Sequence, residues 1–168
     1  MKTEKFSTKK LVLSALFAAL TCVATIIIKI PSPLNGYINL GDGFVLLSAW
    51  LLPPGFSFLA AGIGSALADL FSGYIIYAPI TFAIKGLMAI CAYFVFKVLN
   101  TKPLISRIIS GVTAEVVMIL GYFVFEGFMY GFMPSFANIP ANSIQGLAGI
   151  IIGVLLIERV KKLTERFC

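Results

Sequence analysis

The chain has 168 residues, of which 60% are hydrophobic and 12% charged, and its formal net charge is +6. Soluble domains average about 45–50% apolar and about 25% charged residues, so this composition excludes a soluble enzyme, a disordered chain and a disulfide scaffold. The apolar residues gather in stretches of roughly 20, the length that a helix needs to cross about 30 Å of hydrocarbon. We therefore predict an all-α, polytopic membrane protein that forms a single domain over residues 1–168.

Six transmembrane helices are predicted in chain order. Pro31 and Pro33 end the first, and Pro53-Pro54-Gly55 separates the second from the third, because proline cannot continue a helix. The second and third are barely long enough to cross a membrane, which leaves room for tilting or partial insertion. The predicted ranges are about 9–30, 42–52, 55–72, 78–97, 105–130 and 140–158.

The basic residues predict the orientation of the chain. Four lie before the first span, three between residues 97 and 107, and four after the last span. Basic loops stay in the cytoplasm, so we expect both termini and the central loop to be cytoplasmic. The positive charge therefore indicates membrane topology, and no nucleic-acid partner is expected.

Several polar residues lie inside predicted spans, where an ionisable group costs several kcal/mol unless it is paired or hydrated. Glu115 and Glu126 are 11 residues apart, about three helical turns, so they face one way, with Tyr122 near the same stripe. Most of the set falls in the outer half of the bundle, so we expect one polar pocket open to the outside. The set comprises Asp69, Lys85, Glu115, Tyr122 and Glu126, followed by Asn142 and Gln145 at the start of the sixth span.

Each of these residues also has a structural interpretation. Lys85 could neutralise Asp69 or Glu115 as a structural ion pair. Asp69 could equally lie at the level of the lipid headgroups, and Glu126 could be hydrated near the end of its span. Asn142 could be a helix cap instead of a ligand contact.

The outer loops supply further candidates for binding a solute. The first loop places polar side chains among Gly36, Gly41 and Gly43, whose flexibility suits a lid. In the second loop, Tyr74 and Tyr77 could stack on a flat heterocycle, or belong to the aromatic belt of the membrane boundary. The polar residues of the first loop are Asn35, Tyr37, Asn39 and Asp42.

Missing residue types limit the possible chemistry. The chain has no histidine, so it has neither a Ser-His-Asp triad nor an H-E-x-x-H zinc site, and it has no P-loop. The cysteines Cys22, Cys91 and Cys168 have no paired spacing and are interpreted as structural thiols. We expect no catalysis, no cofactor and no metal.

Small residues recur at helical spacing. Ala15 and Ala19 form A-x-x-x-A in the first span, and Gly149 and Gly153 form G-x-x-x-G in the sixth. Such stripes allow close helix packing, either within the bundle or against another protein.

Longer stretches resemble a known family. One stretch is similar to the second to fourth segments of the S components of energy-coupling factor (ECF) transporters, especially the riboflavin-transporter-like branch. It reads YINLGDGFVLLSAWLLPPGFSFLAAGIGSALADLFSGYIIYAPITFAIKGL. AEVVMILGYFVFEGFMYGF and IPANSIQGLAGIIIG resemble the fifth and sixth segments of that branch. The resemblance covers about residues 8 to 160 and is carried by four motifs that occur together: L-G-D, A-D-L-x-S-G-Y, I-K-G and N-x-x-Q-G.

The resemblance implies a multi-pass, substrate-binding subunit of an ABC-type importer in the cell membrane of a prokaryote. Such a subunit captures a vitamin outside and docks on a transmembrane T subunit that works with two ATPase subunits. The A-x-x-x-A pattern on the first helix of the family contacts the T subunit, and Ala15 and Ala19 match it. The family's pocket is built from the outer loops and the outer halves of helices four to six.

The cargo is expected to be a small, flat, hydroxylated heterocycle. Nickel and cobalt S components use an N-terminal Met-His segment, which this histidine-free chain lacks. A pyridoxine- or hydroxymethylpyrimidine-like compound is our first expectation, and riboflavin the second. The alternative is a stand-alone proton-coupled carrier that uses Asp69, Glu115 and Glu126.

Overall fold

The structure is a computed structural model and describes residues 8–34, 36–99 and 101–167. Four residues named or counted in the predictions lie outside these ranges: Lys2 and Lys5, two of the four basic residues before the first span, and Asn35 and Cys168. The elements in chain order are α1 (Thr8–Ile27), β1 (Ile30–Pro31), β2 (Tyr37–Ile38), α2 (Gly41–Leu51), α3 (Pro54–Phe71), α4 (Ala78–Val98), α5 (Pro103–Tyr130), α6 (Phe132–Ser135), the 3₁₀ helix η1 (Phe136–Asn138) and α7 (Ile139–Phe167).

The ends of the helices follow from local chemistry. Proline occupies the first turn of α3, α4 and α5, where its missing N–H leaves no hydrogen bond unmade. α1 stops at Ile27, earlier than expected, because the chain turns extended before Pro31 and β1 pairs antiparallel with β2. α5 is followed by Gly131, whose φ of 95° favours glycine.

Two segments are more helical than the sequence analysis predicts. The predicted outer loop after α5 contains α6 and η1. α7 continues to Phe167 instead of ending near residue 158, because the tail is rich in Glu, Lys and Arg, which are good helix formers.

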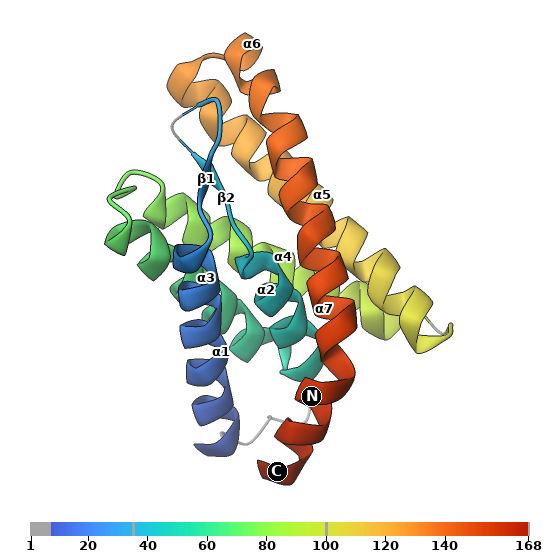
Figure 1. Cartoon of the computed structure of the whole chain (residues 1–168). Helices are drawn as coiled ribbons and strands as arrows, with labels where there is room; N and C mark the ends of the chain where they lie inside the picture. The colour runs from blue at the N-terminus through green and yellow to red at the C-terminus, as the bar shows by residue number, and fades with distance from the viewer. Residues whose placement is uncertain (1–7, 35, 100, 168) are drawn as a thin grey trace.

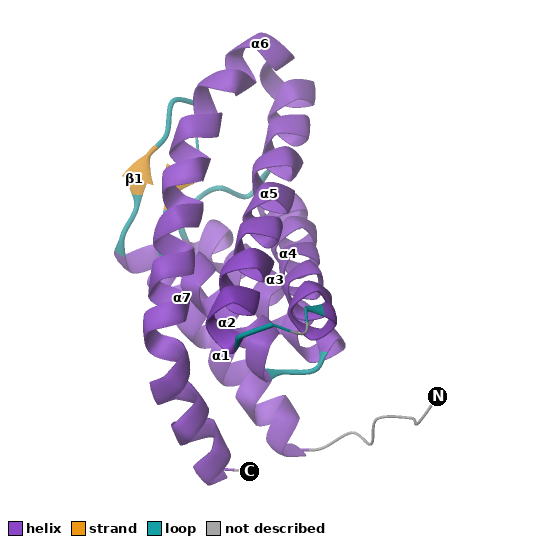
Figure 2. Ribbon diagram, turned by 90° about the vertical axis from the view of Figure 1, so that its right-hand side faces the viewer, coloured by secondary structure: helices purple, strands orange, loops and turns teal. Residues whose placement is uncertain are grey.

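The helices form one bundle with distinct ends (Figure 1). α1 begins and α7 ends at one end, whereas the connection from α5 through α6 to α7 lies at the opposite end, toward which the β1–β2 hairpin extends. Figure 2 shows the same arrangement from the side. Arg107, near the start of α5, pairs with Glu158, in the second half of α7, at 2.7 Å. That the end where α1 begins and α7 ends faces the cytoplasm stays a prediction.

The short helix α2 lies at the centre of the bundle, between α1 and α7 in Figure 1, and also packs against α3 and α4. Val45, Leu46 and Ala49 are fully buried and form one core with Met88 and Met118. At about 1.5 Å per residue, its 11 residues reach only about half of a 30 Å hydrocarbon layer. Its apolar character therefore reflects burial inside the protein.

The other principal helices account for the membrane character. Among the described residues, five helices are long and apolar enough to cross a membrane, and less than half of each such span is buried inside the protein. Large apolar side chains such as Val98, Phe128 and Leu155 are exposed on them, as expected for surfaces that face lipid. The all-α, multi-pass fold with six principal helices is confirmed.

Candidate functional site

A polar cavity lies under the β1–β2 hairpin. Its walls come from the hairpin, the end of α3, the α3–α4 connection, η1, and the parts of α4, α5 and α7 near them. Its volume is about 40 Å³, room for only a few water molecules, so a larger ligand requires the hairpin to move. The described residues that line it are Ser32, Gly36, Tyr37, Asp69, Tyr74, Tyr77, Thr81, Tyr122, Glu126, Asn138, Asn142 and Gln145.

Many of the predicted candidates meet at this cavity although they are far apart in the sequence. Asn142 lies inside α7, three residues after its first residue, so its interpretation as a helix cap is wrong. Asp69 and Glu126 are 5% and 2% exposed, so neither is a hydrated surface carboxylate. The predicted candidates that line the cavity are Tyr37, Asp69, Tyr74, Tyr77, Tyr122, Glu126, Asn142 and Gln145.

Hydrogen bonds hold the hairpin over the cavity. The Tyr37 hydroxyl donates to Asp69 Oδ1 at 2.5 Å, and the Tyr77 hydroxyl donates to the carbonyl oxygen of Leu34 at 3.2 Å. The Leu34 amide donates to Asn138 Oδ1 at 3.3 Å. Burial, reinforced by the charge of Asp69, raises the pKa of Tyr37, so its phenol keeps the proton that it donates. The hairpin is thus fastened to three separate segments.

The two carboxylates of the cavity each have one oxygen that is not used. Asn138 Nδ2 donates to Glu126 Oε1 at 2.7 Å, and Tyr37 donates to Asp69 Oδ1. Glu126 Oε2 and Asp69 Oδ2 are buried without a hydrogen-bond partner in the part of the chain that the structure describes. Because buried polar atoms are usually paired, these oxygens are available to a donor on a bound molecule.

Tyrosine rings form one side of the cavity. The ring centroids of Tyr37 and Tyr74 are 4.8 Å apart, and those of Tyr74 and Tyr77 are 6.3 Å apart with the rings nearly perpendicular. The Tyr122 hydroxyl lies 3.0 Å from the Thr81 hydroxyl. Buried Tyr77 and half-buried Tyr74 therefore line the site, and a flat ring could stack on such aromatic surfaces.

A charged layer lies beneath the cavity. Lys85, which is 3% exposed, forms an ion pair with Asp42. Gln145 Nε2 donates to the other Asp42 oxygen at 2.7 Å, and Gln145 Oε1 accepts from the Asn39 amide at 2.9 Å. The expected pairing of Lys85 with Asp69 or Glu115 is therefore wrong, because Asp42 is its partner. Gln145 connects this layer to the cavity.

Asp42 lies in the first turn of α2 and is fully buried. The predicted helix range of about 42–52 includes it, but its expected exposure in the first outer loop is wrong. A carboxylate is favourable there because it faces the positive end of the helix dipole. Gly41 and Gly43 belong to α2 as well. A Cβ at Gly43 would lie 2.6 Å from Ile152 Cγ2, so this glycine allows close packing against α7.

Glu115 lies apart from the cavity. Both of its carboxylate oxygens are buried without a partner among the described side chains, and a Cβ at Gly146 of α7 would lie 3.0 Å from its side chain. Asn39, Asp42, Lys85 and Glu115 are not among the described residues that line the cavity. Their predicted contact with substrate stays a prediction.

Sequence reasoning missed three polar residues of the cavity, Ser32, Thr81 and Asn138. Thr81 lies one turn before Lys85 on α4, and this spacing was a usable signal. Asn138 carries no local signal, because its partners Leu34 and Glu126 are distant in sequence. No group of three or more His, Cys, Asp or Glu residues that could hold a metal ion occurs within the described ranges.

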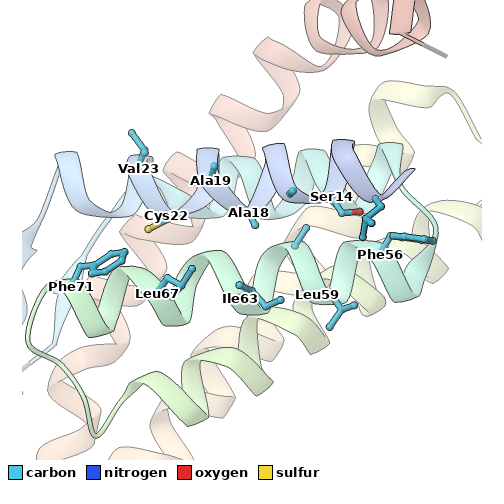
Figure 3. A pocket seen from close by; sticks show the side chains of 13 residues that line it. Ser14, Ala18, Ala19, Cys22, Val23, Phe56, Leu59, Ile63, Leu67 and Phe71 are labelled. Atoms are coloured by element: carbon cyan, nitrogen blue, oxygen red, sulfur yellow. The ribbon is translucent and has the colours of Figure 1, made fainter. Parts of the chain in front are cut away.

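A second hollow is the apolar groove between α1 and α3 (Figure 3), with a volume of about 520 Å³. The α1 wall has small residues, and the α3 wall has bulky ones such as Leu59, Ile63 and Leu67. Ala15 and Ala19 both line this groove and are exposed. The predicted small-residue stripe therefore faces outward beside α3.

A family model and a solved structure both relate this chain to the S components of ECF transporters. The sequence model of the ECF-type riboflavin transporter S component family matches residues 5–162. A protein of Pyrococcus woesei, described as an uncharacterized protein in a gap 3′ region, is 36% identical over 133 residues, which are 78% of this chain and 87% of that protein.

A solved structure, reported as the structure and mechanism of the S component of a bacterial ECF transporter, has the same fold. Its TM-score is 0.75 at 25% sequence identity, and the match covers 92% of this chain and 96% of that one. S components are substrate-binding membrane subunits and not enzymes. The present chain therefore belongs to the ECF-type riboflavin transporter S component family.

Proposed function

We propose that this chain captures a small water-soluble vitamin or vitamin precursor outside a prokaryotic cell and delivers it by docking on an ATP-driven module. That module consists of a transmembrane T subunit and two ATPase subunits. The observation that carries the proposal is the small polar cavity, where side chains from separate segments of the chain converge under a hairpin held by hydrogen bonds.

The chemistry of the cavity supports a flat heterocycle as cargo. Tyrosine rings offer stacking surfaces, and the hydroxyl, amide and carboxylate groups offer hydrogen bonds to ring substituents. The small free volume favours a pyridoxine- or hydroxymethylpyrimidine-like compound over riboflavin, because a single ring requires less displacement of the hairpin than a three-ring system.

The groove between α1 and α3 supports the docking part of the proposal. Ala15 and Ala19 are exposed, and small side chains allow a helix of another subunit to approach closely. The groove is almost wholly apolar in its lining, which suits a transmembrane helix. It is also separate from the cavity, since none of the described residues lines both. Binding and docking should therefore be separable by mutation.

The test compares ligand retention with uptake. The full chain is purified, and small molecules released on denaturation are identified by mass spectrometry; uptake is measured in cells that also contain the T and ATPase subunits. Replacing Ala15 and Ala19 by leucine should abolish uptake and co-purification with the T subunit, while the released ligand remains.

Val12→Phe is the control, because Val12 is exposed on α1 but does not line the groove. Normal uptake by the double variant would overturn the docking role, and a chain that releases no ligand would overturn the binding role.

A further inference from the structure

The charge of the cavity restricts its ligand further. Asp69 and Glu126 are at least nine-tenths buried, and each has an oxygen without a hydrogen-bond partner within the described parts of the chain. An uncompensated buried carboxylate is costly. Two such groups in one cavity indicate that the bound molecule supplies the missing donors or charge.

The cations of the protein do not supply this compensation from inside the cavity. None of the described residues that line it is Lys or Arg. Lys85 does not line the cavity: it is held in the layer below by Asp42 and by Met118 Sδ at 3.0 Å, and its Nζ lies 5.7 Å from the centroid of the Tyr122 ring. Lys29 is exposed at the rim, where its Nζ donates to Ser72 Oγ at 2.9 Å and lies 6.0 Å from the Tyr37 ring centroid.

The aromatic lining points to the same kind of ligand. The face of a tyrosine ring attracts a cation within about 6 Å. Of the four tyrosines that line the cavity, Tyr37 and Tyr122 have Lys29 and Lys85 near their rings, at 6.0 and 5.7 Å, which leaves Tyr74 and Tyr77 for a ligand. Carboxylates beside several aromatic rings therefore bind a positively charged group better than a neutral or negative one. An anionic ligand would place like charges together, and none of the described lining residues is basic and able to contact it directly.

We infer that the ligand is a cation at neutral pH, namely a small aromatic heterocycle with a protonated amine or a positively charged ring nitrogen. This inference rests on the proposed function and specifies its substrate class. The positive group lies between Asp69 Oδ2 and Glu126 Oε2, and the ring packs against the tyrosines. Neutral three-ring compounds and carboxylate-bearing vitamins are poor ligands.

Three probes that share one pyridine ring test the inference. At the same ring position, pyridoxamine has an aminomethyl group, pyridoxine a hydroxymethyl group and 4-pyridoxate a carboxylate. Calorimetry on the full chain in detergent micelles at pH 7 measures each affinity. Pyridoxamine should bind at least about tenfold tighter than pyridoxine, because a charged hydrogen bond contributes about 1.5–3 kcal/mol. The carboxylate should bind at least about 100-fold more weakly than the amine.

Variants connect this preference to the two acids. Asp69→Asn and Glu126→Gln should each reduce the ratio of amine to alcohol affinity by about tenfold. Glu158→Gln should leave the ratio unchanged, because Glu158 pairs with Arg107 and does not line the cavity. Measuring a ratio within each variant separates the effect on charge recognition from a general loss of folded protein.

Two outcomes would overturn the inference. The first is that pyridoxine or 4-pyridoxate binds as tightly as pyridoxamine or more tightly. The second is that the denatured protein releases a neutral or anionic ligand. Either outcome would leave the proposed function intact. If no probe bound and denaturation released no small molecule, the proposed function would fall together with the inference.

Discussion

Replacing Lys85 by methionine keeps most of the side-chain volume and removes the cation from the charged layer. Asp42 would then be a fully buried carboxylate without its ion-pair partner. Breaking a buried ion pair from one side costs about 3–5 kcal/mol. For a protein of this size each kcal/mol lowers the thermal midpoint by about 2–4 °C, so Lys85→Met should denature about 6–20 °C below the wild type.

Thermal denaturation in detergent, followed by the loss of monodisperse protein, measures this effect. The double variant Lys85→Met with Asp42→Asn should recover most of the loss, because it leaves no unpaired charge and the introduced amide oxygen can still accept from Gln145. Lys97→Met is the control, since Lys97 is exposed at the end of α4 and should change stability by at most about 0.5 kcal/mol. A midpoint for Lys85→Met within about 2 °C of wild type, or a double variant no more stable than the single one, would refute this reasoning.

Two further predictions concern packing and the hairpin. Gly64→Ala should destabilise the protein by about 1–3 kcal/mol in the same denaturation assay, because the added Cβ would collide with the carbonyl oxygen of Ala18. Gly55→Ala is the control: its Cβ would meet open space, so it should be neutral or stabilising by up to about 1 kcal/mol. Tyr37→Phe removes the hydrogen bond between the hairpin and α3 and should speed ligand dissociation about 10–100-fold in stopped-flow measurements, whereas Tyr93→Phe, away from the cavity, should not. Unchanged dissociation from Tyr37→Phe would show that this bond does not hold the hairpin closed.

The helices could be predicted from the sequence because their boundaries are set by local chemistry. Proline opens α3 and α5, and most of the basic residues lie outside the apolar spans. The bounds of the short helix α2, Gly41–Leu51, lie within one residue of the predicted range of about 42–52, although L-G-D-G at its start looks like a turn. Gly41 and Gly43 are helical there because of contacts with α1 and α7, which local sequence does not reveal.

Residues of the candidate site could be predicted where a polar side chain lies in an apolar span, because burying it there costs free energy unless it has a partner. Glu126 and Gln145 stand out in apolar spans, and both line the cavity. The pairing of Lys85 with Asp42 was not predictable, because helix spacing gives no information about which acid on another helix lies closest. Asn138 is an ordinary loop residue by sequence, and only the folded chain brings it to Glu126.

The central claim is that this chain binds a small molecule by itself but requires an ATP-driven partner to transport it. Uptake of the ligand recovered from the purified protein, in labelled form, should be measured in proteoliposomes with the chain alone and with the chain plus its T and ATPase subunits. The account predicts binding without accumulation for the chain alone, and ATP-dependent accumulation with the partners. Accumulation by the chain alone, driven by a proton gradient and indifferent to ATP, would contradict it and support the carrier alternative.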